Sequence, residues 1–307
     1  VVESYRQGVE DAADALVAPL RTGGSVDVAE ASMLLAVRVA GRVVGLTDSS
    51  VTGMSRRLGA FFEGDLSSGA GGVRDRLRQL RTSTALLRLY WLDVKPAIRA
   101  RRRRPGDDVV SQLLQDGCSD LEVLTECVTY AAAGMVTTRE FITLAAWHLL
   151  DEPALLAHYR ACDVEGRRAL LEEVLRLEPV VGRLERRTTA PVTVEHDGAE
   201  VELPAGTVVV LDLRAANADE ALVGGDAERL RPGRTLAERG WSGSVLSFGD
   251  GHHRCPGGPL ALMESEVLLT RLLAEDLVAD GPPRVGWGAV TQGYELRGFT
   301  VRRAAPA

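Results

Sequence analysis

Lysine is almost missing from this chain of 307 residues, since Lys95 is the only one and arginine supplies nearly all of the basic side chains. We attribute this preference to the codon usage of a GC-rich genome. Acidic residues outnumber basic ones by 43 to 36, and the net charge is −7. A chain with this balance lacks the positive field that nucleic-acid-binding proteins use. We therefore expect no nucleic-acid partner.

Cysteine is also scarce, and long apolar runs are absent. Four cysteines are too few and too scattered for a disulfide framework, which favours a reducing compartment. The sequence contains no run of 18 apolar residues and no signal peptide. We therefore expect a cytoplasmic protein without a membrane segment. The first residue is Val1 rather than Met, and we expect an N-terminal part to be missing.

The rest of the composition is typical of a folded protein, with 45% apolar and 26% charged residues. Helical periodicity dominates the first part of the chain, and alternating strand patterns with turns follow it. We predict a single, mainly α domain over 1–307, with a helical part over 1–180 and strands, loops and one more helix over 181–307. The expected helices are 1–21, 28–46, 73–104, 119–150, two that end near residue 179, and 256–273; strands are expected within 188–213 and in a closing hairpin over 285–302, and a flexible loop over 64–72.

Five arginines gather at the end of the helix expected over 73–104, namely Arg99 and Arg101–Arg104. Such a run can form a nucleic-acid or membrane patch. No aromatic residues interleave with it, however, and basic residues near the C-terminal end of a helix interact favourably with its dipole. We interpret the run as a solvated helix end.

The most informative segment is a glycine-rich loop with one cysteine, Cys255, just before the helix expected over 256–273. The loop glycines permit close backbone approach, and the helix N-terminus beyond the cysteine favours a thiolate over a thiol. The residues alone leave several interpretations open. Cys255 could be a nucleophile with His253 as its base, a zinc ligand with His252 and His253, an axial ligand of a flat cofactor, or an incidental cysteine in a loop.

The order of residues in this loop resembles the haem-binding loop of the cytochrome P450 family. The resemblance implies that Cys255 is the axial thiolate ligand of the iron in haem b (iron protoporphyrin IX). It also implies that Phe248 packs near the thiolate, and that His253 and Arg187 reach the two haem propionates. The matching positions are Phe248, Gly249, Gly251, His253, Cys255, Gly257, Leu260 and Ala261.

A Glu–Arg pair three residues apart, Glu173 and Arg176, precedes the loop by about 80 residues. Taken alone, such a pair is most often a surface ion pair that contributes only a few tenths of a kcal/mol. The P450 family carries E-x-x-R on its K helix, where the pair forms a buried network with an arginine from the segment before the haem loop. The resemblance therefore implies a structural network of Glu173, Arg176 and, as the third member, Arg229.

A third segment, Ala133-Gly134-Met-Val136-Thr137-Thr138, lies within the long helix expected over 119–150. Glycine is unfavourable inside a helix by about 1 kcal/mol relative to alanine, so an ordinary helix does not explain it. It resembles the A-G-x-acid-T-T segment of the family's central I helix, which implies catalytic roles for Ala133, Gly134, Thr137 and Thr138. The family's acid is replaced here by Val136, so the proton must come from water, the substrate or Glu140.

The resemblance extends over nearly the whole chain and implies the P450 fold, mainly α with a long central I helix and minor antiparallel sheets. The resemblance implies that residue 1 corresponds to the family's D helix. We therefore expect the A–C helix region to be lacking, either because this chain is incomplete or because the protein is a truncated homologue. The implied function is a haem-thiolate monooxygenase that oxidises a hydrophobic small molecule with O2 in secondary metabolism. Electrons would come from NAD(P)H through a ferredoxin reductase and a ferredoxin. The alternatives are a non-catalytic auxiliary protein of a natural-product pathway and a peroxygenase that uses hydrogen peroxide.

Overall fold

The computed structural model of the protein describes residues 2–62, 73–196, 198–234, 236, 242–288 and 291–305. The loop expected over 64–72 lies outside these residues. The helical part comprises a 3-10 turn at Val2–Tyr5, then α1 Arg6–Arg21, α2 Val28–Val44, α3 Val51–Phe62, α4 Val73–Leu89, a π-helical turn Tyr90–Val94, α5 Lys95–Arg103, α6 Val109–Gln115, α7 Asp120–Tyr130, a second π-helical segment Ala131–Val136, α8 Thr137–Asp151, α9 Pro153–Ala161 and α10 Val164–Leu177.

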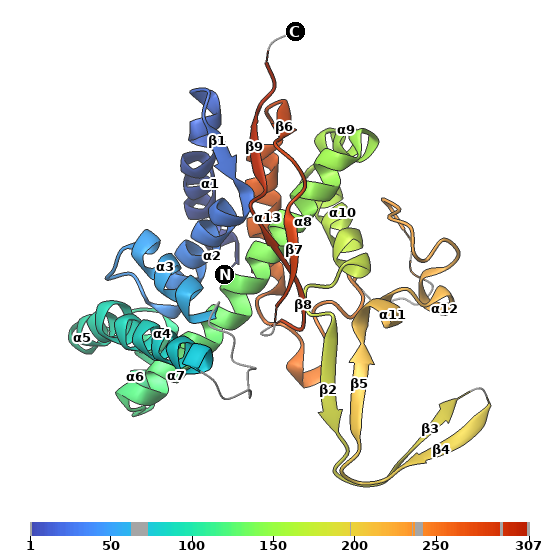
Figure 1. Ribbon diagram of the computed structural model, residues 1–307, viewed down its shortest axis with the longest axis horizontal. Helices are drawn as coiled ribbons and strands as arrows, with labels where there is room; N and C mark the ends of the chain where they lie inside the picture. The colour runs from blue at the N-terminus through green and yellow to red at the C-terminus, as the bar shows by residue number, and fades with distance from the viewer. Residues whose placement is uncertain are drawn as a thin grey trace.

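One long helix, formed by α7, the second π-helical segment and α8, runs through the centre of the molecule (Figure 1). It starts, as expected, at residue 119, with a capping box in which the Ser119 hydroxyl accepts from the Glu122 N–H and the Glu122 carboxylate accepts from the Ser119 N–H. The helix is not uniformly α-helical, because residues 131–136 widen into a π-helical segment at Gly134. Such widened turns are frequent at functional sites.

Two apolar cores flank this long helix. The first brings together α1, α2, α8, α10 and α13 (Gly258–Leu272), with Leu35, Ile142 and Leu269 fully buried. The second joins α2 and α3 to the helices α4 to α7, around Val94, Ile98 and Met135. The long helix contributes side chains to both cores, which positions it rigidly within the body of the protein.

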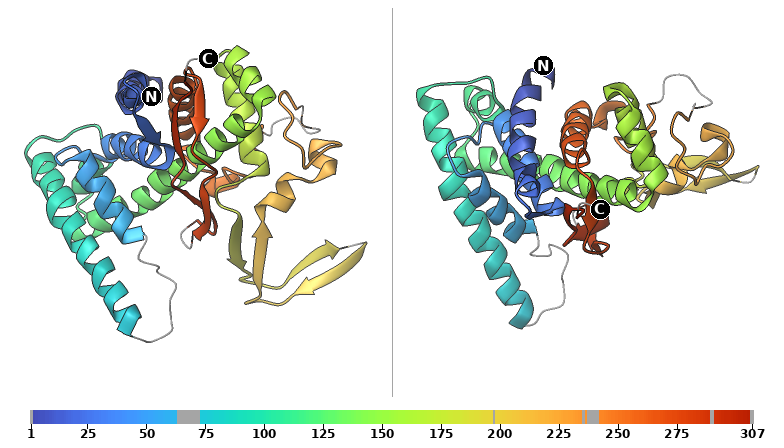
Figure 2. Two further views of the ribbon diagram at one scale, coloured as in Figure 1. Left: turned by 45° about the horizontal axis from the view of Figure 1, so that its top comes forward. Right: turned by 90° about the horizontal axis from the view of Figure 1, so that it is seen from above.

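A second long helix is formed by α4, the π-helical turn and α5, and it lies at an outer edge of the molecule in both views of Figure 2. It ends before Pro105, as the sequence predicts. Arg101 pairs with Asp108 at 2.5 Å between Nε and Oδ2, and Arg102 pairs with Asp120 at 2.7 Å between Nη2 and Oδ1. These two arginines therefore help to anchor the helix end.

The strands form small antiparallel sheets, as predicted, and two of the hairpins extend away from the helical body (Figure 1). The pairs are β2 Arg183–Arg187 with β5 Val208–Asp212, β3 Val192–His196 with β4 Ala199–Leu203, β7 Arg284–Gly288 with β8 Gly293–Arg297, and β9 Thr300–Arg303 with both β1 Ser25–Asp27 and β6 Leu277–Ala279. Within the closing hairpin expected over 285–302, β7 and β8 pair as predicted. The last strand, β9, does not join this hairpin and pairs instead with β1 and β6.

The segment between β5 and α13 contains two short helices, α11 Leu213–Asn217 and α12 Glu220–Val223, and a 3-10 turn at Gly251–His253. Within the described part of the chain, no helix is long and apolar enough to cross a membrane.

Candidate functional site

Backbone hydrogen bonds link the two ends of the loop that precedes α13, over residues 246–255. The Cys255 N–H donates to the Phe248 carbonyl oxygen at 2.7 Å, and the Gly249 N–H donates to the Leu246 carbonyl oxygen at 2.8 Å. Gly249 and Gly251 have φ values of +70° and +63°, which side chains with a Cβ rarely adopt. The loop therefore holds Cys255 in a fixed position, and its side chain is exposed.

The Phe248 side chain packs between the loop and the start of α13. Its ring packs against α13 so closely that a Cβ added at Gly258 would lie 3.3 Å from it. Cys255 and Phe248 also line a pocket of about 460 Å³ together with Arg254. His253 is exposed in the 3-10 turn, Gly257 is half-buried beside the cysteine, and Ala261 is half-buried on the first turns of α13.

The long central helix has one open face near its π-helical segment. Tyr130 is 39% exposed, Ala133 is exposed, and Gly134 and Thr137 are half-buried. A Cβ at Gly134 would meet only the Ala40 Cβ, at 4.0 Å. These side chains share one face because they are spaced by three or four residues.

Thr137 and Thr138, which the sequence analysis treats together, lie on different sides of this helix. The Thr137 hydroxyl donates to the Ala133 carbonyl oxygen at 2.5 Å. Thr138 and Val136 are both buried, with exposed fractions of 4% and 2%. Only Thr137 of the two threonines is therefore available to a molecule on the open face.

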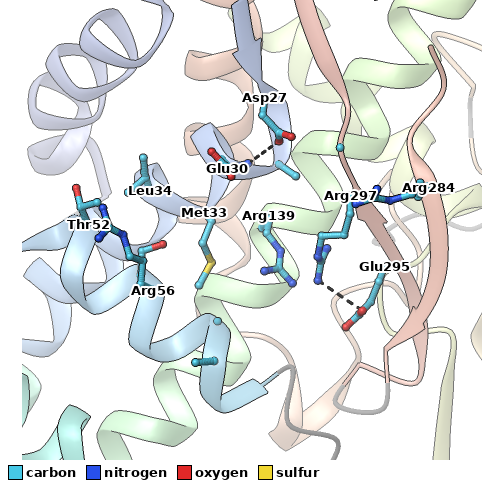
Figure 3. A pocket seen from close by; sticks show the side chains of 15 residues that line it. Asp27, Glu30, Met33, Leu34, Thr52, Arg56, Arg139, Arg284, Glu295 and Arg297 are labelled. Carbon is cyan, nitrogen blue, oxygen red and sulfur yellow. Dashed lines mark hydrogen bonds and ion pairs between the residues drawn. The ribbon is translucent and has the colours of Figure 1, made fainter. Parts of the chain in front are cut away.

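The Glu140 carboxylate is fully buried and fully engaged. It accepts hydrogen bonds from Arg139 Nε at 2.8 Å, from Arg297 Nη1 at 2.7 Å and from the Leu296 N–H at 2.8 Å. Figure 3 shows Arg139 of α8 and Arg297 of β8 in a pocket of about 780 Å³, with Met33 of α2 among its other lining residues. Glu140 thus ties the central helix to β8, and its buried, fully bonded carboxylate does not face the open side of the helix as a proton source.

The Glu173–Arg176 pair is buried and forms a network. Arg176, which is 0% exposed, donates from Nε and Nη2 to the two Glu173 carboxylate oxygens at 2.7 and 2.9 Å. Its Nη1 also donates to the carbonyl oxygens of Ala227 at 2.7 Å and Asn217 at 3.0 Å. Burial alone would raise the Glu173 pKa, but the bonds from Arg176 and Arg234 outweigh it and hold this pKa below its usual range.

The third arginine of this network is Arg234, not Arg229. Arg234 Nε donates to Glu173 Oε1 at 2.9 Å, whereas the Arg229 side chain is exposed and only its carbonyl oxygen accepts from Arg176 Nη2, at 3.3 Å. A turn causes the difference, because Gly233 has a φ of +74° and the Arg234 N–H bonds back to the Arg231 carbonyl oxygen. The chain thereby brings Arg234 to Glu173.

Asn217 connects this network to the cysteine loop. Its side-chain amide, fully buried, donates to the Arg176 carbonyl oxygen at 3.0 Å and to the Ser247 hydroxyl at 2.9 Å. Its carbonyl oxygen accepts from the Leu246 N–H at 2.9 Å. The segment Ala215–Asn217 resembles the P450 family in sequence, but only the structure shows that Asn217 joins α10 to the loop that carries Cys255.

Arg187 lies on β2, and its Nη1 donates to the Gly206 carbonyl oxygen at 2.7 Å, in the turn between β4 and β5. In this structure its guanidinium is therefore held at the small sheet. The role implied for it in binding a propionate stays a prediction.

Glu264, on α13, is a buried carboxyl that the sequence analysis did not single out. It is 4% exposed, and Oε2 has no hydrogen-bond partner among the described residues. Burial raises the pKa of Glu264 well above its usual range. It stands nine residues after Cys255 and packs in the helix that begins at the loop, so its protonation state affects how firmly α13 is held.

We expect Glu264→Gln to increase the free energy of unfolding at neutral pH. A carboxyl whose folded pKa is raised stabilises the fold only at low pH, and this contribution is lost as the pH rises from about 4.3, the unfolded value, through the folded pKa. Urea denaturation at several pH values should therefore show a flatter pH dependence for the variant. Glu266→Gln is the matched control, because buried Glu266 pairs with Arg6 and Arg167 and its loss should destabilise the protein; an equal effect of both variants contradicts the prediction.

The comparisons with known proteins agree with this geometry. The model of the family described as Cytochrome P450 matches residues 167–275. The chain is 33% identical over 277 residues to "Cyclomarin C epoxidase CymV" of Salinispora arenicola, which covers 87% of this chain and 65% of that protein. It is 32% identical over 188 residues to "Erythromycin C-12 hydroxylase" of Saccharopolyspora erythraea, covering 59% of this chain and 44% of that protein.

Solved structures show the same likeness over almost the whole chain. The open form of cytochrome P450 EryK from S. erythraea superimposes with a TM-score of 0.76 at 26% identity, covering 98% of this chain and 75% of that one. Cytochrome P450 CYP109Q5 from Chondromyces apiculatus gives a TM-score of 0.74 at 27% identity, covering 99% and 73%. In its sequence and its fold, the chain is similar to the cytochrome P450 family. It spans less than two thirds of the length of the two curated relatives named above.

This likeness implies a haem iron cofactor, and the residues of the cysteine loop fit it. The loop offers one exposed thiol, Cys255, in a backbone held by two glycines with positive φ. Across the ranges that the structure describes, no group of three or more His, Cys, Asp or Glu side chains gathers to hold a metal ion. Of the loop residues, Cys255 is the one that would hold a haem iron.

Proposed function

We propose that this P450 is a haem-thiolate monooxygenase, with haem b as its cofactor and Cys255 as the only protein ligand of the iron. The observation that carries the proposal is the closed loop that presents one exposed thiol at the start of α13. When bound, the haem iron supplies the activation of O2, and the protein positions and protonates the reactants. The family resemblance assigns His253 and Arg187 to the propionates.

The chain's own residues have distinct tasks in this proposal. Phe248 packs under the cysteine loop and fixes the position of the thiol. Asn217 and Arg176 hold the loop to α10, so the thiol cannot move away from α13. On the open face of the central helix, Ala133 and Gly134 leave room for a small molecule, and the Thr137 hydroxyl holds a proton at Oγ1 beside it.

We infer a hydrophobic substrate because the described residues on this open face, apart from Thr137, are Tyr130, Ala133 and Gly134. The names of two relatives refer to cyclomarin C and erythromycin, which supports a role in secondary metabolism for this protein too. Electrons are proposed to reach the haem from NAD(P)H through a ferredoxin reductase and a ferredoxin. The presence of Cys255 favours this function over a non-catalytic auxiliary protein, and Thr137 favours it over a peroxygenase.

The direct test is the absorption spectrum of the haem-loaded, reduced protein with carbon monoxide bound. A thiolate ligand shifts the Soret band to the long-wavelength position that gives the family its name. Oxygenation is then tested with a ferredoxin, its reductase and NADPH, using a panel of apolar natural products. A thiolate-type spectrum with product formation supports the proposal, whereas failure to bind haem overturns it, and product formed only with added hydrogen peroxide indicates the peroxygenase.

Thr137→Val should lower the amount of product formed per NADPH consumed and increase the release of hydrogen peroxide. Proton transfer by a positioned group typically contributes about 10²–10⁴ in rate, and Val keeps the shape of the side chain but removes its hydroxyl. Thr138→Val is the control, because Thr138 is buried away from the open face. If both variants uncouple equally, or neither does, the proton is delivered by another route.

A further inference from the structure

The long helix at the outer edge of the molecule carries a line of exposed apolar side chains. Leu80 is 63% exposed, Leu87 59% and Trp91 58%, and Thr84 is also exposed. These four residues follow one another at intervals of four, three and four, which is the alternation of positions a and d in a coiled-coil seam. We call Leu80, Thr84, Leu87 and Trp91 the α4 seam.

The seam is not needed to attach the helix to the protein. Along α4, the opposite side already packs into the second core through Ala85 and Leu89, which are both buried. Beyond the π-helical turn Tyr90–Val94, which rotates the helix, Val94 and Ile98 pack into the same core. Both views of Figure 2 place the helix at an edge of the molecule. The helix thus has one apolar face that packs into the core and a second, the α4 seam, whose side chains are exposed to solvent.

The helix that carries the seam has a large excess of basic over acidic side chains. Residues 73–104 contain eleven basic and two acidic side chains, although the whole chain has a net charge of −7. Arg101 and Arg102 are paired with carboxylates. Arg81 and Arg88 directly follow the seam residues Leu80 and Leu87, and no carboxylate of the residues placed by the structure pairs with either.

We propose that the α4 seam binds an acidic, amphipathic α-helix of a partner protein. The seam spacing matches the side-chain rows of one helix, and arginines at the flanking e positions select a partner with Glu or Asp at the facing positions. A second copy of the chain would bring two basic helices together, which like-charge repulsion opposes. A lipid surface calls for a broad apolar face, whereas the exposed apolar side chains here are those of the seam and its neighbour Leu92. The inference is independent of the proposed monooxygenase activity.

The probe is a synthetic peptide of about three heptads with Leu at positions a and d and Glu at e and g, labelled with a fluorophore and used below its own self-association concentration. Its counterpart carries Lys at e and g. By fluorescence anisotropy with the full chain, we expect the Glu peptide to bind at least about tenfold more tightly than the Lys peptide. Its binding should weaken as salt rises from about 0.05 to 0.5 M.

Two double variants test the seam itself. Arg81→Glu with Arg88→Glu should reverse the preference, so that the Lys peptide binds more tightly. Leu87→Gln with Trp91→Gln should weaken the binding of either peptide by at least about tenfold. The control is Arg284→Glu with Trp287→Gln on β7, since both of its residues are also exposed, Trp287 by 61%. It should leave binding unchanged, and circular dichroism confirms that each variant is folded.

Several results would overturn the proposal. They are no binding of the Glu peptide, equal binding of both peptides, and a loss of binding in the β7 control as large as in the seam variants. Binding of the chain to phosphatidylserine vesicles through Trp91 without peptide binding would instead identify a lipid surface. A dimer that the Leu87 and Trp91 variant dissolves, seen by analytical ultracentrifugation, would identify a second copy as the occupant.

Discussion

Glu173→Ala is expected to destabilise the protein by about 3–5 kcal/mol, because it leaves the fully buried Arg176 and the nearly buried Arg234 without their shared carboxylate. The loss should also loosen the cysteine loop, since Asn217 links Arg176 to Ser247 and Leu246. The measurements are chemical denaturation and the fraction of purified protein that holds haem. Both should fall in the variant.

The pH dependence provides a second measurement of the same network. Because the folded Glu173 pKa is lowered, its stabilising contribution is complete above the unfolded value of about 4.3 and is lost as the pH falls through the folded pKa. The difference in stability between the wild type and Glu173→Ala should therefore shrink in acid.

The control for this variant is Glu3→Ala. Glu3 and Arg6 form an i,i+3 pair with the same 2.7 Å distance between Arg Nε and Glu Oε2, but here the carboxylate is exposed and the arginine only half-buried. Its loss should change stability little. If Glu173→Ala behaves like Glu3→Ala, the buried network does not hold the fold together.

Cys255→Ser is expected to abolish the thiolate-type absorption band of the reduced, carbon-monoxide-bound protein, because serine cannot supply the sulfur ligand. The three other cysteines serve as controls. Burial raises the pKa of Cys127 to about 12, so its thiol stays protonated, and Cys162 lies 3.5 Å from His158 Nε2 at the end of α9, away from the loop. Serine at Cys118, Cys127 or Cys162 should leave the band in place.

A thiolate-type band that persists in Cys255→Ser would refute the assignment of the ligand. A band that disappears only when Cys118, Cys127 or Cys162 is replaced would do the same. Loss of haem from Cys255→Ser together with a folded, cooperative unfolding transition agrees with the assignment, because the iron then has no protein ligand in the loop.

The features that depend on neighbouring residues could be predicted from the sequence. The capping box at Ser119 and Glu122, the glycine loop around Cys255 and the i,i+3 pair Glu173–Arg176 each follow from spacing within a few residues. Local backbone geometry determines such features, so the order of the residues is enough. The helical first part and the antiparallel strands of the second part follow in the same way from the periodicity of apolar residues.

Contacts between distant residues were decided only by the tertiary structure. Arg234 rather than Arg229 reaches Glu173 because a turn at Gly233 redirects the chain. Glu140 is occupied because β8 brings Arg297 to it from 157 residues away. The sequence by itself determined the loop, its cysteine and the helices that flank it, since these depend on local spacing. Which charges are buried, which threonine lies on the open face and which helix side stays exposed depend on packing between segments far apart in the chain, and no local pattern encodes that.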